Sequence, residues 1–224
     1  YNTHTPETTS ISGTKTWDDA DDQDGKRPDS IKVNLLANGE VVQTKTVTEK
    51  DNWSYTFDNL PVYEEGKVGQ KLTYTISEES VKDYTTVVKD NNIINSYTPG
   101  KVGVSVTKIW DDAGNQDGIR PAEITVNLLA DGDIYATKEV TEADGWKYNF
   151  TDLPKYKNGN KITYTITEDA VEDYQTLVNG FDITNSYTPG KTSVSVTKAW
   201  DDADNQDGKR ARNIKVRLLA DGNV

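Results

Sequence analysis

The chain of 224 residues carries 28% charged and 33% hydrophobic residues and a net charge of −12, and it contains no Cys and no Met. Recurrent Trp, Tyr and β-branched residues exclude a disordered chain, and the length suits one large or two ordinary domains. The negative charge and the lack of a Lys/Arg cluster argue against a nucleic-acid partner and against membrane insertion. The lack of Cys excludes disulfides, thiolate metal sites and a Cys nucleophile.

One segment occurs three times along the chain. The pattern T-K-x-W-D-D-A-x-x-Q-D-G begins at Thr14, Thr107 and Thr197. A period of about 90 residues matches one complete small domain rather than a solenoid unit. The linkers S-Y-T-P-G each carry one Pro, so we expect neighbouring domains to be loosely stiffened rather than freely jointed. The predicted organisation is a linker at 1–6, complete domains at 7–99 and 100–189, and the N-terminal part of a third domain at 190–224.

The elements predicted in chain order are short β-strands. Runs of five to eight residues alternate polar and apolar side chains, are rich in Val, Ile, Thr and Tyr, and end at turn residues. The pairs Asn38-Gly39 and Asp131-Gly132 predict tight hairpins. Short strands at this spacing predict an all-β sandwich in each repeat. Those named for the first repeat are Ile31–Leu36, Glu40–Val47, Trp53–Phe57 and Leu72–Ser77.

Three polar residues of each complete repeat share a strand face with apolar residues. Because side chains alternate between the two faces of a strand, Lys108 falls on the same side as Val104, Val106 and Trp110. The same test turns a Glu on a later strand and an Asn on the last strand toward the core. The residues singled out are Lys15, Glu78 and Asn95; Lys108, Glu168 and Asn185; and Lys198 of the third repeat, which has no Glu or Asn partner in this chain.

Burying a lone ammonium or carboxylate is costly, so three arrangements compete for these residues. They can lie at strand ends with their polar groups in water, or Lys and Glu can form a partly buried salt bridge. In the third arrangement desolvation lowers the pKa of Lys, and the neutral amine attacks the Asn amide. A protonated Glu would then transfer protons while ammonia leaves. The residue pattern alone leaves all three open.

The segments S-V-T-K-I-W, I-T-Y-T-I-T-E-D and D-I-T-N-S-Y-T-P resemble the B-type repeats of collagen-binding surface proteins and pilins of Gram-positive bacteria, the CnaB family. The resemblance covers essentially the whole chain. It implies tandem inverse immunoglobulin-like β-sandwich domains, two complete and one partial, each with a self-formed Lys–Asn isopeptide bond and an acidic catalyst. Carried across residue by residue, it implies the bonds Lys15–Asn95 and Lys108–Asn185, promoted by Glu78 and Glu168.

Other notable residues are given simpler interpretations. Glu79 and Asp169 follow the implied acids, but strand alternation points them outward, so we reject them as catalysts. Trp53 and Trp146 recur at strand starts and are interpreted as core residues in preference to ligand anchors. His4 stands alone in a linker and receives no role.

The acidic loop Asp18–Gly25, repeated at Asp111–Gly118, is a weak candidate for calcium, which favours clustered carboxylates. Its spacing fails the EF-hand pattern, so a turn with Asx hydrogen bonds is the favoured interpretation, with Arg27 and Arg120 pairing with its carboxylates. We therefore predict no bound metal and no cofactor. The calcium alternative rests on Asp18, Asp19, Asp21, Asp24, Asp111, Asp112 and Asp117.

The predicted function is structural: repeats of a stalk or spacer in a bacterial surface adhesin, located outside the cell and anchored to the cell wall. No segment is apolar enough for a signal peptide or a membrane helix, so those signals are expected outside this fragment. The expected partners are neighbouring repeats in the same chain and, through another domain of the parent, a host matrix protein. Direct matrix binding by these repeats is the alternative. A turnover enzyme is disfavoured because the only reactive set consumes itself once.

The incomplete third repeat is a separate problem. Its residues, 190–224, are too few to bury a core of their own. We expect this segment either to be disordered or to dock its apolar strand on another module or chain.

Overall fold

The computed structural model describes residue 1 and residues 3–224, and it is built almost entirely from β-strands. It divides into two compact units, Tyr1–Thr188 and Pro189–Val224. Within the described residues no helix is long and apolar enough to cross a membrane.

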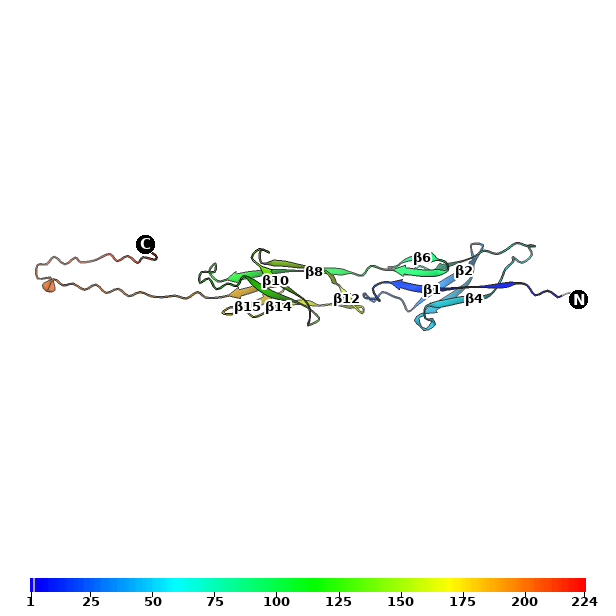
Figure 1. The fold of residues 1–224 in the computed structure, drawn as a ribbon, viewed down its shortest axis with the longest axis horizontal. Helices are drawn as coiled ribbons and strands as arrows, with labels where there is room; N and C mark the ends of the chain where they lie inside the picture. Colours follow the sequence, from blue (N-terminus) through cyan, green and yellow to red (C-terminus); the bar gives the residue numbers. More distant parts are fainter. Residues whose placement is uncertain (2) are drawn as a thin grey trace. The chain divides into compact units, whose positions relative to one another are not determined.

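The first sandwich, which we call module 1, is formed by the strands between Thr8 and Ser96 (Figure 1). Its strands are β1 (Thr8–Asp18), β2 (Ser30–Ala37), β3 (Glu40–Thr48), β4 (Ser54–Pro61), β5 (Tyr74–Glu78), β6 (Thr85–Lys89) and β7 (Asn92–Ser96), and a short 3-10 helix, η1 (Glu49–Asp51), precedes β4. A four-stranded sheet has the order β4-β1-β7-β6, and a three-stranded sheet has the order β3-β2-β5.

Module 2, formed by the strands between Lys101 and Ser186, repeats this arrangement. Its strands are β8 (Lys101–Asp111), β9 (Glu123–Ala130), β10 (Asp133–Thr141), β11 (Lys147–Pro154), β12 (Tyr156–Lys157), β13 (Asn160–Lys161), β14 (Tyr164–Glu168), β15 (Gln175–Asn179) and β16 (Asp182–Ser186). The sheets have the orders β11-β8-β16-β15 and β10-β9-β14, and β12 and β13 form a small hairpin. The prediction of tandem all-β sandwiches is confirmed.

The first and last strands of each module are parallel neighbours in the larger sheet. β1 pairs with β7, with Lys15 opposite Ile93 and Trp17 opposite Asn95. β8 pairs with β16 in the same register. Parallel strands need a long connection, and here the rest of the module supplies it. The strands at which the chain enters and leaves a module therefore lie side by side.

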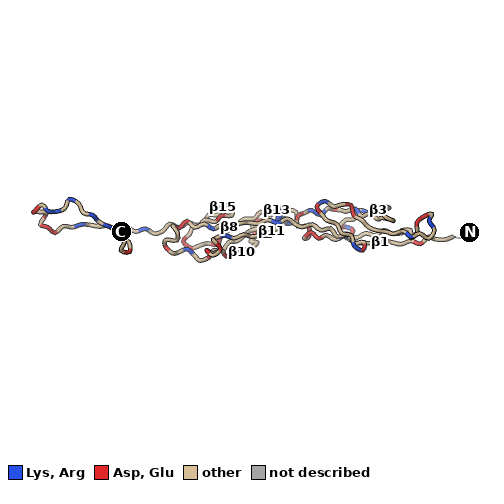
Figure 2. The backbone as a smooth tube through the Cα atoms, turned by 90° about the horizontal axis from the view of Figure 1, so that it is seen from above, with Lys and Arg blue, Asp and Glu red and all other residues tan. Residues whose placement is uncertain are grey.

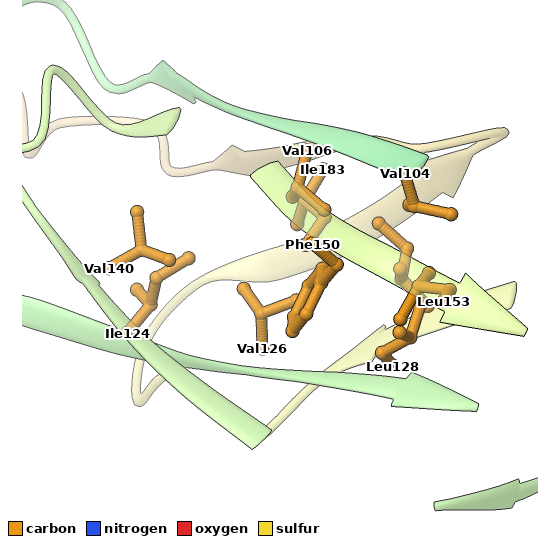
Figure 3. Close-up of a cluster of buried hydrophobic side chains, with 10 residues drawn as sticks. Val104, Val106, Ile124, Val126, Leu128, Val140, Phe150, Leu153 and Ile183 are labelled. Carbon is orange, nitrogen blue, oxygen red and sulfur yellow. The ribbon is translucent and has the colours of Figure 1, made fainter. Parts of the chain in front are cut away.

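Each module has its own hydrophobic core between its two sheets. In module 2, Val106 and Ile183 of the larger sheet face Ile124 and Val126 of β9 (Figure 3). A separate cluster fills module 1, including Leu35, which is fully buried. Burial of each such side chain stabilises the fold by about 1.5–3 kcal/mol. Two separate cores fit the proposal of one domain per complete repeat.

Module 1 departs from module 2 at Gly13, which occupies the place of Val106 in the repeat. A Cβ atom at Gly13 would lie 1.9 Å from the carbonyl oxygen of Asn91 and 2.7 Å from the hydroxyl of Tyr55. The Tyr55 hydroxyl donates a hydrogen bond to that same carbonyl. The Tyr55 side chain and its hydrogen bond thus fill the space that a valine side chain at position 13 would need.

The predicted hairpins are present, and their turn residues explain them. Asn38 and Gly39 join β2 to β3 with φ of 50° and 91°, and Asp131 and Gly132 join β9 to β10 with φ of 52° and 96°. Two successive positive φ angles define the tight turn that matches the twist of the flanking strands, and Asn-Gly and Asp-Gly adopt it readily.

Two strand boundaries differ from the sequence prediction. Trp53 has a φ of 51° and lies before β4, which begins at Ser54. β5 begins at Tyr74, because the backbone N–H of Leu72 donates to Val62 outside the sheet. In both places a local turn or hydrogen bond delays the start of the strand that the apolar pattern predicts.

Residues 190–224 contain no β-strand; their regular structure is a 3-10 turn, η2 (Ala203–Asn205). Val194 and Trp200, expected on the core face of a first strand, are 65% and 40% exposed. Lys198 is exposed as well, because these residues supply no second sheet to cover that face.

Acidic and basic residues are interspersed along the modules, with no single basic stretch in the described chain (Figure 2). Burial of a charged residue requires a partner or a change of protonation. Among the described residues, five charged residues are nevertheless buried: Lys15, Asp19, Asp24, Lys108 and Asp112. The side chains of Glu78 and Glu168 also have no exposed surface.

Candidate functional site

Each module buries a lysine and an asparagine on its first and last strands. Lys15 is 5% exposed and Asn95 is completely buried. Asn95 lies opposite Trp17 on β1, two residues beyond Lys15, and all three side chains belong to the core face. Diagonal neighbours on one face of a sheet are within reach of a long side chain, so the Lys15 amine can reach the Asn95 amide.

A glutamate reaches the same place from the opposite sheet. Glu78 ends β5, and its Oε1 lies 3.4 Å from the Nζ of Lys15, with both side chains fully buried. In module 2 the Nζ of Lys108 lies 3.1 Å from the Oε1 of Glu168, again with both side chains fully buried. A strand-end arrangement with the charged groups in water is thereby excluded for both pairs.

The atoms of these residues are poorly satisfied. In each module the Lys Nζ, one Glu oxygen and both amide atoms of the Asn are buried without a hydrogen-bond partner in the described structure. Leaving one buried polar group unsatisfied costs about 1–3 kcal/mol, and native proteins contain few such groups. The same four atoms recur in both modules, at Lys15, Glu78 and Asn95 and at Lys108, Glu168 and Asn185.

Burial changes the protonation of the lysines. Desolvation outweighs the attraction of Glu78 and lowers the pKa of Lys15 to about 8. The pKa of Lys108 is lowered to about 8 for the same reason, against the attraction of Glu168. A neutral amine, which is nucleophilic, is therefore much more accessible here than in a solvated lysine.

Aromatic rings and a second ion pair enclose the amine in module 1. The Nζ of Lys15 lies 4.0 Å from the centre of the Trp17 ring, and the guanidinium of Arg27 lies 5.6 Å from it. Arg27 donates to both carboxylate oxygens of Asp19, at 2.7 and 3.1 Å, and the Tyr84 hydroxyl donates to Asp19 at 2.8 Å. Burial opposes ionisation of Asp19, but these hydrogen bonds prevail and lower its pKa.

Module 2 repeats this second ion pair. Arg120 donates to Asp112 at 2.6 and 2.9 Å, and Tyr174 donates to it at 3.1 Å. The pKa of Asp112 is lowered to about 2, chiefly by the hydrogen bonds from Arg120. The predicted pairing of the arginines with the acidic loop is confirmed.

Asp24 of the acidic loop holds the linker that follows module 1. Its Oδ2 accepts hydrogen bonds from the Tyr97 hydroxyl at 2.9 Å and from the Gly100 backbone at 2.8 Å. Asp117 likewise accepts from the Tyr187 hydroxyl at 2.9 Å. These contacts give the end of the loop a structural role.

The other carboxylates named for calcium are dispersed. Asp18 accepts from the Ser96 hydroxyl at 3.3 Å, the Asp21 side chain is fully exposed, and Asp111 is exposed. Across residue 1 and residues 3–224, no three His, Cys, Asp or Glu side chains are grouped to hold a metal ion. The loop geometry therefore favours the Asx-turn interpretation.

The rejected acids lie where alternation predicts. Glu79 is exposed and lies 3.3 Å from the Nζ of Lys32. Asp169 is exposed and accepts a hydrogen bond from the Asn127 amide at 2.8 Å. Neither contacts the buried lysine of its module.

The recurrent tryptophans are half-buried and pack against the core of their module, which favours the core interpretation over a ligand anchor. Trp53 packs edge-on against Trp17, with ring centres 5.2 Å apart. Trp146 packs in the same way against Trp110, at 5.1 Å. Both join the hydrophobic cluster of their module.

A threonine that was not predicted from the sequence lies beside each acid. The hydroxyl of Thr86 on β6 donates to Glu78, and the hydroxyl of Thr176 on β15 donates to Glu168. Both strands are exposed along their length, so no apolar alternation marks one face as inward. The remaining indication is the register of β6 against β7, which places Thr86 opposite Asn95.

Removal of the arginine from the second ion pair should measure how much this pair contributes to the stability of module 1. In Arg27→Met the buried carboxylate of Asp19 keeps the hydrogen bond from Tyr84 but loses its charged partner, and we expect the free energy of unfolding of module 1 to fall by about 3–5 kcal/mol. Lys32→Met, which breaks the exposed pair with Glu79, is the matched control and should change it by less than about 1 kcal/mol. Chemical denaturation monitored by Trp fluorescence measures both, and equal effects would contradict this assignment.

Comparison with known proteins places these features in a family. The sequence model of the Cna protein B-type domain matches residues 11–96, 104–186 and 194–224. A collagen adhesin of Staphylococcus aureus is 41% identical over 99% of this chain, and the match spans 27% of the adhesin.

Two solved structures from the same organism are similar. The crystal structure of two B repeat units (B1B2) of its collagen binding protein is 50% identical, with a TM-score of 0.75 over 92% of this chain and 57% of that one. The structure of a single B repeat unit (B1) is 47% identical, covering 82% of this chain and 100% of that one, with a TM-score of 0.39. The chain belongs to the family of Cna protein B-type domains.

Proposed function

We propose that each complete module closes itself with an isopeptide bond, between Lys15 and Asn95 in module 1 and between Lys108 and Asn185 in module 2. The observation that supports this most strongly is the recurrence of the same buried set in both modules: a Lys–Glu ion pair whose facing atoms have no other partner, and an Asn amide with no hydrogen bond. The bond converts these groups into an uncharged amide and so removes the cost of burying them.

The reaction needs only groups already in the core. One proton passes from the Lys15 ammonium to Glu78, and the neutral amine attacks the side-chain carbonyl carbon of Asn95. A new C–N bond forms, Glu78 gives its proton to Nδ2 and takes a second proton from Nζ, and the C–Nδ2 bond breaks so that the nitrogen leaves as ammonia and Glu78 ends protonated. Enforced proximity contributes on the order of 7–11 kcal/mol toward such a barrier. The acid is regenerated, but Lys and Asn are consumed, so each module reacts once.

The bond would stabilise the module by closing a long loop. Lys15 is on the first strand and Asn95 on the last, so nearly the whole module lies between them. In the chain-entropy account developed for disulfides, a loop of this size contributes about 4–5 kcal/mol through the unfolded state. A chain without Cys would gain by this bond what other secreted domains gain from disulfides.

The parallel pairing of the first and last strands suits a mechanical role. Force entering module 1 along β1 would cross from Lys15 to Asn95 and leave at Ser96. The residues between the two bonded positions would carry little load. Modules of this kind in tandem form a spacer that resists extension and proteolysis. The array therefore serves as a stalk of a cell-wall-anchored bacterial surface adhesin.

Matrix binding by the modules themselves is the second candidate function. It is favoured by the names of two relatives, a collagen adhesin and a collagen binding protein. The match covers only 27% of that adhesin. A pull-down of the isolated two-module fragment against matrix proteins separates the two functions, because a spacer retains none of them.

The bond predicts a change in mass. The intact chain should be lighter than its sequence by two ammonia molecules, one for each complete module. Glu78→Ala should restore one of them, because module 1 then lacks its acid while module 2 still reacts. The control Glu79→Ala, at the exposed neighbour, should leave both losses in place, and a wild-type chain of unshifted mass would contradict the proposal.

The rate of bond formation should depend on pH through the proton that the Lys amine and the Glu carboxyl share. The reactive form, a neutral amine beside a protonated carboxyl, holds the same number of protons as the ion pair. Because the pKa of Lys15 and Lys108 is about 8, that proton is lost above this pH and the acid is no longer available. Ammonia release should therefore slow as the pH rises from 8 to 10. A rate that increases over this range would show that the free amine reacts without the acid.

Single-molecule pulling tests the mechanical role. The wild-type modules should not lengthen under load, since their interior is bypassed. Lys15→Ala should release the length of module 1 alone, in a single step, and Lys32→Ala should release none. Extension of both wild-type modules would overturn the stalk mechanism.

A further inference from the structure

The two oxygens of each buried glutamate have different partners. In module 1, Oε1 of Glu78 lies 3.4 Å from the Nζ of Lys15, while Oε2 accepts a hydrogen bond from the Thr86 hydroxyl at 2.8 Å. In module 2, Oε1 of Glu168 lies 3.1 Å from the Lys108 Nζ. Its Oε2 accepts from Thr176 at 3.0 Å. The division of roles is therefore the same in both copies.

The threonine comes from the sheet that carries the reacting residues. Thr86 lies directly opposite Asn95 in the pairing of β6 with β7. Glu78 comes from β5 of the other sheet. The hydrogen bond thus joins the two sheets beside the Asn95 amide. It links the position of Glu78 to β6, the strand that pairs with the strand carrying Asn95.

A carboxyl group needs such a restraint. The last torsion of a glutamate side chain is broadly distributed, so burial alone does not fix the plane of the carboxyl group relative to the amine. Thr86 is solvent-exposed, whereas the Glu78 side chain is fully buried. The Thr86 hydroxyl thus restrains the buried acid from an exposed edge strand.

The two modules differ at the residue before this threonine but keep the threonine itself. Position 85 is Thr in module 1, but its counterpart in module 2 is Gln175, whereas Thr86 and Thr176 both keep the hydroxyl. Strand formation does not require a hydroxyl, since valine suits a strand at least as well as threonine. Thr→Val therefore removes the hydrogen bond while keeping the shape and the strand preference.

We infer that Thr86 and Thr176 are positioning residues for isopeptide formation. Each anchors Oε2 of its glutamate, so that Oε1 alone exchanges the proton with the lysine and delivers it to the departing nitrogen. This inference rests on the proposed function. It adds a residue that acts through the acid, not on the reacting atoms.

The test compares Thr86→Val, Thr86→Ser and the wild-type chain, with module 2 as the internal control. Each chain is made by cell-free synthesis and quenched with acid at intervals. Intact mass gives the loss of ammonia, and a peptide digest assigns it to a module. Positioned acid–base catalysis contributes 10²- to 10⁴-fold, so loss of positioning should slow module 1 by at least about tenfold in Thr86→Val. Thr86→Ser should react within about threefold of wild type.

The outcomes distinguish failure of the positioning role from failure of the proposed isopeptide bond. Equal rates in Thr86→Val and wild type would overturn the positioning role, and so would equal slowing in Val and Ser. A wild-type chain that never loses ammonia would instead overturn the proposed function. Thermal unfolding of Thr86→Val in a Lys15→Ala background, where no bond forms, shows whether module 1 is folded at the assay temperature. If it is not, Thr176→Val in module 2 carries the same test, with module 1 as control.

Discussion

The burial of a lysine, a glutamate and an asparagine in an apolar core is the constraint on which the rest of this structure depends. Lys15 and Glu78 lie 3.4 Å apart with no exposed side-chain surface, beside a fully buried Asn95. An ion pair in such surroundings seldom repays its desolvation unless its remaining hydrogen bonds are satisfied. In both modules a Thr hydroxyl satisfies Oε2 of the Glu, but the Lys Nζ has no hydrogen bond beyond the ion pair and the Asn amide has none. The proposed conversion to an amide would resolve the conflict, and the folded module brings the three residues close enough for it.

Several other features follow from this constraint. The parallel pairing of the first and last strands brings Lys and Asn together across nearly the whole module. The opposite sheet supplies the acid, and the edge strand supplies the threonine that orients it. The rings of Trp17 and Tyr84, with the pair Arg27–Asp19, pack near the amine and help exclude water.

Strand alternation was enough to predict the core face of β1, β5 and β7, and with it Lys15, Glu78 and Asn95. Asn38-Gly39 predicted its hairpin for the same local reason. The pattern failed where tertiary contacts decide. Thr86 lies on an exposed edge strand with no alternation, and Lys198 lies in a segment with no facing sheet. Gly13 interrupts an apolar face because Tyr55 and Asn91, distant in sequence, occupy its space.

The most direct test of the account is an atomic-resolution crystal structure of the two complete modules. Continuous electron density should join the Nζ of Lys15 to the side-chain carbonyl carbon of Asn95, with no density for the Asn95 Nδ2 atom. Lys108 and Asn185 should be joined in the same way. Separate side chains in both modules, each asparagine with an intact amide, would contradict the central claim.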